Sequence, residues 1–332
     1  MGQDIYFFEA FAEEAAALRR VLPERISAGF TDKTIQECAA LPHAPARLIS
    51  IRTQSEIPVS WAGSLAGLLT RSTGYDHVRV YRRQIQQPQF PCGYLPLYCA
   101  RAVAEQAALL WMALGRKLFR QTQQFATFQR DGLTGLECEH KVLLVVGVGH
   151  IGGEVVRIGR GLGMRVLGVD IVKPAVDVEL VDLERGLPQA DVIVCCMNLT
   201  PLNHGLFNAA RWRQVRPGAL FVNIARGEHA PAADLLAALE AGWLGGVALD
   251  VYEQEQALAV ALRRGEPAGR ALSGLARRSE VILTPHNAFN TQEAVTRKAE
   301  QSVRQIEHFL QRGRFLWPVP LDACCAVGGL PV

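Results

Sequence analysis

The sequence lacks several features that mark membrane, secreted and nucleic-acid-binding proteins. No stretch reaches the roughly 18 consecutive apolar residues of a membrane-spanning helix, so we expect no membrane span. The opening segment, MGQDIYFFEAFAEE, has no basic region followed by an apolar one and does not resemble a signal peptide. The formal net charge is only +3 and no long basic stripe occurs, which argues against nucleic acid as a partner.

The cysteines lack the spacing of a metal site or a disulfide framework. No CxxC pair occurs, so we expect no bound metal. The eight cysteines are Cys38, Cys92, Cys99, Cys138, Cys195, Cys196, Cys324 and Cys325. Reduced cysteines of this kind are typical of a cytoplasmic protein.

The composition is that of a globular protein. The chain has 332 residues, of which 49% are hydrophobic and 20% charged, and it is long enough for two domains. In the first hundred residues, DIYFF (4–8) and RLISI (47–51) predict strands, and EEAAALRRVL (13–22) predicts an amphipathic helix. LLTRSTGYDHV (68–78) predicts a strand that leads into a loop, and the prolines of 84–98 mark a domain boundary.

Two long helices are predicted on either side of the second half of the chain. Residues 100–120 are rich in alanine and leucine and contain no proline, which favours one helix that crosses between domains. Residues 291–313 predict a second long helix. We expect it to return to the first domain, which would make that domain discontinuous.

From Lys141 onward, short apolar runs alternate with helix-like segments. The runs are VLLVV (142–146), RVLGV (165–169), VIVCC (192–196), ALFVNI (219–224), GVALDV (246–251) and VIL (281–283). One helical segment places Pro231 at a first-turn position and ends near Gly242. Continuous apolar strands alternating with helices predict an α/β fold with a parallel sheet covered on both faces.

A glycine-rich turn follows the first of these strands. In VGVGHIGG, Gly147, Gly149 and Gly152 form the pattern GxGxxG between an apolar strand and a helix. Gly147 permits the tight turn, Gly149 lets the backbone approach a pyrophosphate, and Gly152 lets helix and strand pack closely. The free N–H groups at the helix start suit the phosphates of a dinucleotide.

The next strand ends at Asp170, where a carboxylate can accept hydrogen bonds from the adenosine ribose. It would repel a 2′-phosphate, which favours NAD over NADP, although the nearby Lys173 weakens that preference. The alternative is a structural glycine turn with a surface aspartate. The joint presence of strand, turn and acid disfavours it.

Three further strand ends carry polar residues. Arg226 follows ALFVNI, the acids Asp250, Glu253 and Glu255 lie in or after GVALDV, and His286 follows VIL. Open α/β sheets bind ligands at the carboxyl ends of their strands. A cation, an acid and a histidine at such positions therefore indicate a catalytic site, whereas a single loop histidine is usually solvated.

These motifs together resemble a known family. VGVGHIG, VNIARG, ALDVYEQE and LTPHNAFNT are similar to the signature regions of the D-isomer-specific 2-hydroxyacid dehydrogenases, in order and spacing. RSTGYDHV and LPLYCARAVAEQ resemble the D-lactate dehydrogenase-like branch. The resemblance implies two Rossmann-like or flavodoxin-like domains with doubly wound parallel sheets. An NAD-binding domain (100–290) would be inserted into a substrate domain (1–99 and 291–332), and the protein would be a homodimer.

The resemblance also implies catalytic roles. Arg226 would bind the carboxylate and carbonyl oxygen of a 2-keto acid through its planar fork. His286 would be the general acid and base, and Glu255 would pair with it, since a neighbouring carboxylate favours the charged imidazole. Glu253 is expected to be a solvated acid.

Further positions are assigned by the same resemblance. Contacts with the cofactor are expected from His150, Ile151, Met197, Asn198, Asn203, Ile224, Ala225 and Asp250, of which Asp250 would hold the nicotinamide carboxamide. The family often has a proline where this chain has Asn198. Contacts with the substrate are expected from Thr73, Gly74 and Tyr98.

We therefore expect an NAD-dependent enzyme that reduces a small 2-keto acid to the D-2-hydroxy acid. One alternative keeps this chemistry but uses a phosphonate-bearing or bulkier acid, for which Arg52 and Arg101 would be spare cations unless they are solvated surface residues. Another alternative is a dinucleotide-sensing module without turnover, which the intact Arg226, Glu255 and His286 disfavour.

Overall fold

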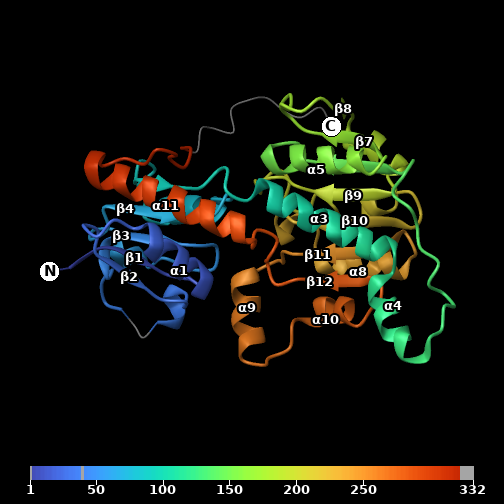
Figure 1. Cartoon of the computed structure of the whole chain (residues 1–332), viewed down its shortest axis with the longest axis horizontal. Coiled ribbons are helices and arrows are strands. Elements are labelled where there is room, and N and C mark those ends of the chain that lie inside the picture. The colour runs from blue at the N-terminus through green and yellow to red at the C-terminus, as the bar shows by residue number, and fades with distance from the viewer. Residues whose placement is uncertain (1, 39–40, 322–332) are drawn as a thin grey trace. The chain divides into compact units, whose positions relative to one another are not determined.

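The computed structural model describes residues 2–38 and 41–321 (Figure 1). The predictions for Cys324 and Cys325 lie outside the described residues. The chain divides into two compact units, of which the first comprises Met1–Cys99 with Thr291–Val332 and the second Ala100–Asn290.

The first unit is built on a parallel sheet of five strands. Its strands are β1 (Gln3–Phe7), β2 (Ala28–Phe30), β3 (Ala46–Ile51), β4 (Gly67–Thr70) and β5 (Cys92–Gly93). They are arranged in the order β2-β1-β3-β4-β5, and every pair is parallel. The chain first adds strands on one side of β1 and then on the other, so the strand order reverses between β1 and β3.

Three helices accompany this sheet: α1 (Ala12–Val21), α2 (Asp76–Gln84) and α11 (Gln292–Arg312), with short 3-10 turns η1 (Ile35–Glu37) and η2 (Val59–Trp61). The C-terminal helix α11 packs against α1 and β4. The hydroxyl of Thr291 accepts a hydrogen bond from Ala294 N at its start, and Gly313 takes a left-handed conformation at its end. These are ordinary helix start and stop signals.

The second unit contains a seven-stranded sheet in the order β12-β11-β10-β9-β6-β7-β8, again with every pair parallel. Its strands are β6 (Val142–Val146), β7 (Arg165–Val169), β8 (Glu179–Leu180), β9 (Val192–Cys195), β10 (Ala219–Asn223), β11 (Leu244–Leu249) and β12 (Val281–Leu283). The predicted α/β class with two parallel sheets is confirmed.

The helices of this unit are α3 (Ala100–Gly115), α4 (Leu118–Gln124), α5 (His150–Gly161), α6 (Leu183–Gly186), α7 (Ala209–Trp212), α8 (Ala232–Glu240), α9 (Glu255–Arg263) and α10 (Arg270–Ala276). The 3-10 turns are η3 (Phe125–Thr127), η4 (Leu187–Gln189) and η5 (Gly227–His229). Helices α3 and α5 pack side by side, and α3 also contacts β10 and β11 (Figure 1).

The single helix predicted for 100–120 is wrong. Helix α3 ends at Gly115, Lys117 adopts a left-handed backbone with φ of 53°, and α4 starts at Leu118. The carbonyl of Gly115 accepts a hydrogen bond from Leu136 N at 2.9 Å, so a distant segment replaces the next helical turn. The loop predicted up to residue 78 is also too long, because α2 begins at Asp76. Pro231 immediately precedes the first helical residue of α8.

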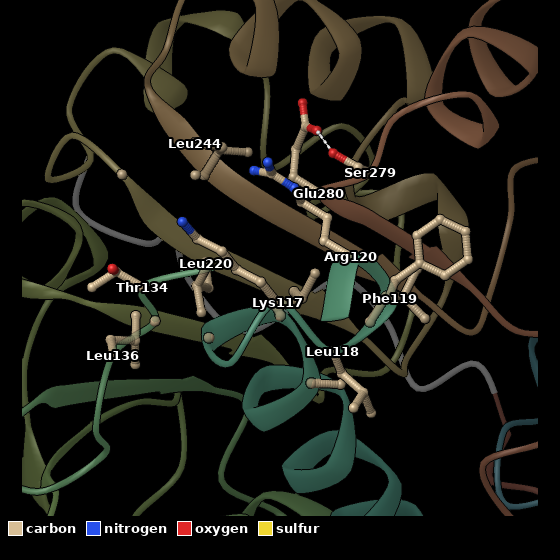
Figure 2. Close-up of a pocket in the computed structure, with 17 residues that line it drawn as sticks. Lys117, Leu118, Phe119, Arg120, Thr134, Leu136, Leu220, Leu244, Ser279 and Glu280 are labelled. Carbon is tan, nitrogen blue, oxygen red and sulfur yellow. Dashed lines mark hydrogen bonds between the residues drawn. The ribbon is translucent and has the colours of Figure 1, made fainter. Parts of the chain in front are cut away.

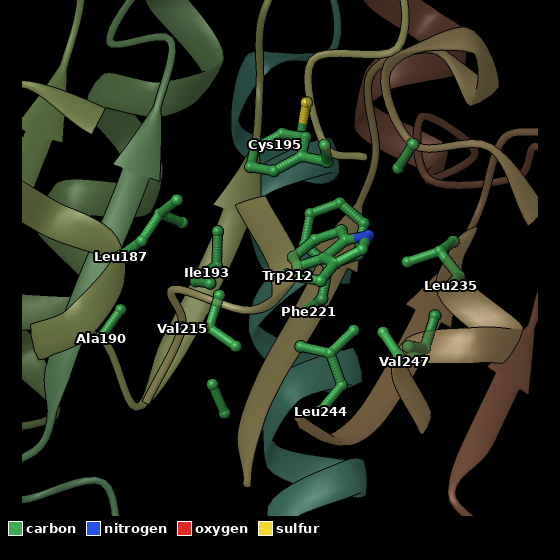
Figure 3. Close-up of a cluster of buried hydrophobic side chains, with 14 of the residues drawn as sticks. Leu187, Ala190, Ile193, Cys195, Trp212, Val215, Phe221, Leu235, Leu244 and Val247 are labelled. Carbon is green, nitrogen blue, oxygen red and sulfur yellow. The ribbon is translucent and has the colours of Figure 1, made fainter. Parts of the chain in front are cut away.

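An aromatic cluster fills the core of the second unit (Figure 3). Phe207, Trp212 and Phe221 are all fully buried, and their ring centroids lie 4.9–5.2 Å apart. Phe221 belongs to β10, so this packing holds the central strands that lead into the polar loops described below.

We expect Phe221→Ala to lower the free energy of unfolding by about 3–5 kcal/mol, because it removes a ring from a closely packed core. Urea denaturation would measure this loss. The matched control is Leu202→Ala, at a side chain that is 79% exposed, and it should change stability by less than about 0.5 kcal/mol. Equal effects of the two substitutions would contradict the importance of this cluster.

Candidate active site

The glycine turn between β6 and α5 has the geometry expected of a phosphate-binding turn. Gly147 has φ of 92°, and a Cβ placed there would lie 2.8 Å from Met197 N. A Cβ on Gly152 would lie 2.0 Å from Gly147 O, whereas one on Gly149 would meet nothing within 4 Å. A side chain at Gly147 or Gly152 would collide with the protein's own backbone, so the fold requires glycine at both positions. Gly149 keeps open space beside the amino end of α5, where a diphosphate can approach the helix N–H groups.

Asp170 joins the end of β7 to this turn. Its carboxylate accepts hydrogen bonds from Val148 N at 2.6 Å and Val172 N at 3.0 Å. Ile171 and Val172 beside it are exposed apolar side chains, which suit contact with a flat ring. His150 and Ile151 form the first turn of α5. These positions fit a bound dinucleotide, and the individual contacts of Asp170, His150 and Ile151 stay predictions.

The loop after β9 is closed by its own hydrogen bonds. Asn203 Oδ1 accepts from Thr200 N at 2.8 Å, and Asn203 Nδ2 donates to Asn198 O at 2.8 Å. Asn198 is exposed and Met197 is half-buried against the core. Asn203 therefore stabilises the conformation of the loop. The cofactor contacts of Met197, Asn198 and Asn203 stay predictions.

Arg226 follows β10 and is held mainly through its backbone. Its carbonyl accepts a hydrogen bond from Asn223 Nδ2 at 2.8 Å, and His229 Nδ1 lies 3.1 Å from the same oxygen. Its guanidinium donates to Ala225 O at 2.7 Å. Asn223 and His229 are fully buried, and sequence reasoning missed both. The side chains of Ile224 and Ala225 are buried as well, so only their backbone could meet a cofactor.

His286 and Glu255 form the predicted pair. His286 Nδ1 lies 2.6 Å from Glu255 Oε1, and both side chains are about four-fifths buried, with 19% and 18% exposed. Glu255 is the first residue of α9, and His286 follows β12. His286 has φ of 50° and Gln254 has φ of 49°, an uncommon conformation for residues other than glycine. The surrounding chain must therefore hold both segments in place.

Asp250 supplies much of that restraint. Its carboxylate is 1% exposed and accepts hydrogen bonds from Thr284 Oγ1 at 2.5 Å, Asn287 N at 2.9 Å and Ala288 N at 2.8 Å. Burial raises the pKa of Asp250, and these hydrogen bonds partly offset the rise. Asp250 thus anchors the loop that carries His286. Its predicted contact with the nicotinamide stays a prediction.

Tyr252 and Glu253 stabilise the segments around the site of the second unit through hydrogen bonds. The hydroxyl of Tyr252 donates to Thr284 O at 2.7 Å, which ties the ends of β11 and β12 together. Glu253 was expected to be a solvated acid, and this is wrong. It is half-buried and accepts a hydrogen bond from Ala232 N at 2.8 Å, which satisfies the amino end of α8.

The residues predicted to contact the substrate lie in the first unit. Thr73 and Gly74 follow β4 and are half-buried, and the Thr73 hydroxyl donates to Leu95 O at 3.0 Å. Tyr98 is buried, and burial raises its pKa well above the ordinary value. Arg101, in the second unit, is paired with Glu105 at 2.6 Å and Glu154 at 3.4 Å, so its charge is already matched.

A cavity of about 520 Å³ lies at the opposite, amino edge of the second sheet (Figure 2). Leu220, Leu244 and Ile282 border it near the starts of β10, β11 and β12, and Lys117 and Phe119 border it from the other side. Because strands of a parallel sheet all end at the other edge, this cavity takes no part in the site of Arg226 and His286.

Among residues 2–38 and 41–321, no cluster of three or more histidine, cysteine or acidic side chains could hold a metal ion. Within the same residues, no helix combines the length and apolar character needed to cross a bilayer.

A histidine–carboxylate pair and an arginine at neighbouring strand ends of a dinucleotide-binding sheet define the class of an NAD-dependent oxidoreductase. Comparison with known families agrees. Residues 108–288 match the family described as D-isomer specific 2-hydroxyacid dehydrogenase, NAD binding domain. The chain belongs to the D-isomer-specific 2-hydroxyacid dehydrogenase family.

Individual relatives support the same placement. The D-lactate dehydrogenase of Escherichia coli K12 is 34% identical over 229 residues, which are 66% of this chain and 68% of that protein. The D-3-phosphoglycerate dehydrogenase of Synechocystis sp. PCC 6803 is 33% identical over 63% of this chain and 37% of its own length. The structure of D-lactate dehydrogenase from Aquifex aeolicus, complexed with NAD and lactic acid, superposes with a TM-score of 0.80. It covers 94% of this chain and 98% of that chain at 24% identity, which shows the shared fold.

The glycine turn gives a test of the cofactor cradle. Gly149→Ala should leave the melting temperature unchanged, because its Cβ meets no neighbour within 4 Å. It should raise the Kd for NADH at least about tenfold, since a methyl group there displaces the diphosphate from a charge-assisted hydrogen bond. Fluorescence titration with NADH would measure this.

Gly152→Ala is the matched variant. Its Cβ would collide with Gly147 O, so it should lower the free energy of unfolding by about 1–3 kcal/mol. If Gly149→Ala bound NADH as tightly as the unsubstituted protein, the diphosphate would not lie in this turn.

Proposed function

We propose that the protein reduces a small 2-keto acid to the D-2-hydroxy acid with NADH, and catalyses the reverse oxidation. The observation that carries this proposal is the 2.6 Å contact between His286 and Glu255, which places a proton donor at the cofactor-binding sheet. Arg226, Glu255 and His286 follow β10, β11 and β12, which are direct neighbours in that sheet.

The bound nicotinamide supplies the hydride. Arg226 binds the carboxylate and the keto oxygen, because its planar fork matches two oxygens at once, and it stabilises the negative charge that develops on the oxygen. His286 donates a proton to that oxygen through Nε2, while Nδ1 stays bonded to Glu255. In the oxidation direction, neutral His286 accepts the hydroxyl proton.

The remaining roles follow from this assignment. The second unit binds NAD, and Asp170 selects NAD over NADP because it repels a 2′-phosphate. The first unit binds the rest of the substrate, with Thr73, Gly74 and Tyr98 in contact with it. The chain is also similar to a D-3-phosphoglycerate dehydrogenase. This similarity favours a variant of the proposed function in which the acid carries a second anionic group.

We expect His286→Ala to lower kcat/KM for keto-acid reduction by about 10²–10⁴-fold, the usual contribution of a general acid. The Kd for NADH should not change, because the imidazole acts on the substrate. Steady-state assays at 340 nm with pyruvate and related keto acids would measure the loss. His140→Ala, at an exposed histidine, is the control. Retained activity in His286→Ala would identify a different proton donor.

We also propose that the protein is a cytoplasmic homodimer. Large apolar side chains are exposed along α3, α4 and η3 and at the residue that follows η3: Leu109, Met112, Leu118, Phe119, Phe125 and Phe128. Phe125 and Phe128 are 76% and 75% exposed, which is costly for a monomer in water. A second copy that packs on the same surface would cover them with two-fold symmetry.

The six described cysteines carry no disulfide, which fits a reducing compartment.

The double substitution Phe119→Glu/Phe125→Glu should convert the dimer to a monomer, because it places charges in an apolar interface. Sedimentation velocity would show the change in mass. Leu202→Glu introduces one such charge at an exposed apolar residue outside this surface and should leave the dimer intact. A dimer that survives the double substitution would place the interface elsewhere.

A further inference from the structure

The backbone carbonyl of Arg226 accepts hydrogen bonds from several donors at once. Asn223 Nδ2 donates to this oxygen at 2.8 Å, and the backbone N of His229 donates at 3.3 Å. The side chain of His229 reaches the same oxygen, with Nδ1 at 3.1 Å. These contacts fix the orientation of the peptide group between Arg226 and Gly227, and with it the backbone from which the Arg226 side chain extends.

The contact with Arg226 also fixes the tautomer of His229. A carbonyl oxygen has no hydrogen to donate, so the hydrogen must lie on Nδ1 of the imidazole. His229 is 0% exposed. Burial of a polar side chain costs free energy unless the side chain is hydrogen-bonded, and an apolar side chain of similar size would fill the same space at less cost. The bond from Nδ1 is therefore what a histidine supplies here and an apolar residue would not.

Asn223 holds the same turn through its buried amide. It is the last residue of β10 and is 0% exposed. Its Oδ1 accepts a hydrogen bond from Ala225 N at 3.1 Å, while its Nδ2 binds the Arg226 carbonyl. Asp250 N donates to the Asn223 carbonyl at 3.0 Å. Asn223 therefore connects the turn that carries Arg226 to the ends of β10 and β11.

The residues after Arg226 are restrained by two other segments of the second unit. A Cβ on Gly227 would lie 1.9 Å from the carbonyl carbon of Tyr252 and 2.2 Å from Glu253 N, so the two backbones are in direct contact. The carbonyl of His229 accepts a hydrogen bond from Phe207 N, in the loop after β9, at 2.8 Å. Because its backbone is held in this way, His229 has a fixed position from which its imidazole can restrain Arg226.

We infer that His229, together with Asn223, is a positioning residue for Arg226. The hydrogen bond from Nδ1 holds the Arg226 carbonyl and thereby sets the direction in which the guanidinium leaves the backbone. Recognition of two oxygens by one planar fork needs an alignment within roughly 0.5 Å, which a freely rotating peptide group would not maintain. The inference rests on the proposed function, in which Arg226 binds the carboxylate and the keto oxygen of the substrate.

Two substitutions of His229 separate its hydrogen bond from its volume. His229→Asn keeps a donor near the position of Nδ1 in a smaller side chain, whereas His229→Leu keeps the volume without a donor. We expect His229→Leu to lower kcat/KM for pyruvate reduction by about 10–100-fold, mainly through KM, because a small displacement of a binding group has an effect of this size. His229→Asn should recover most of this loss. Its melting temperature should nevertheless be no higher than that of His229→Leu, since the smaller side chain leaves a cavity.

A double-mutant cycle with Arg226 distinguishes positioning from a general structural role. In the Arg226→Gln background, His229→Leu should lower kcat/KM by less than about twofold, because the side chain that His229 positions has already been removed. The apparent pKa of the pH–rate profile should be the same in His229→Leu as in the unsubstituted protein, because the proton is assigned to His286.

Asp191→Ala is the control for a loss of stability alone. The Asp191 carboxylate accepts a hydrogen bond from Val142 N at 2.8 Å, and both residues lie at the starts of their strands, at the edge of the sheet opposite Arg226. The substitution should lower the melting temperature and leave kcat/KM unchanged. A parallel fall in kcat/KM would mean that reduced stability is enough to explain the effect of His229→Leu.

The tautomer of His229 can be tested without a substrate. In protein labelled with ¹⁵N-histidine, the imidazole shifts that disappear in His229→Asn should show the hydrogen on Nδ1. A hydrogen on Nε2 would overturn the inference whether or not any keto acid is reduced. Unchanged kcat/KM in His229→Leu, no recovery in His229→Asn, or a full loss that persists in Arg226→Gln would also overturn it. If the hydrogen lay on Nδ1 and no keto acid were reduced, the proposed function would fail and the hydrogen bond to Arg226 would stand.

Discussion

The hydrogen bond between His286 and Glu255 depends on the parallel arrangement of β10, β11 and β12. Strands that run in one direction all end at the same edge of a sheet, so residues far apart in the sequence meet there. Arg226, Glu255 and His286 each follow one of these strands. The packing of the sheet therefore positions both segments, and the hydrogen bonds of Asp250 hold the loop in which His286 has its left-handed conformation.

Asp250 links the packing of the sheet to the position of His286. It stands at the end of β11 with its carboxylate nearly inaccessible, and it binds three donors from the segment that carries His286. A buried carboxylate is costly unless its oxygens are satisfied, and the His286 loop satisfies them. The same hydrogen bonds thus stabilise a buried charge and restrain the segment that carries the imidazole, as the proposed proton transfer by His286 requires.

The two sheets use their carboxyl edges in different ways. In the second unit, Gly149 leaves open space beside the uncharged N–H groups at the start of α5, where we propose that the phosphates of the dinucleotide bind. In the first unit, Arg71, Lys298 and Glu14 fill the interior behind the strand ends with charge. A chain with a net charge of only +3 can therefore still concentrate positive charge at one place. These charged residues are brought together only in the folded protein, because they come from α1, α11 and the end of β4.

The strands of the second unit, the glycine turn and the order of Arg226, Glu255 and His286 were predictable, because each depends on a local run of residues or a short motif. The short strands β2, β5 and β8 have too few residues to show an alternation, and the break after Gly115 depends on a hydrogen bond from Leu136. In TRKAEQS, Lys298 has the pattern of a surface lysine, yet it is buried. The sequence by itself determined the fold class and the residue types of the site. Only the tertiary structure decided which charges are paired, because burial and hydrogen bonding join residues that no local pattern relates.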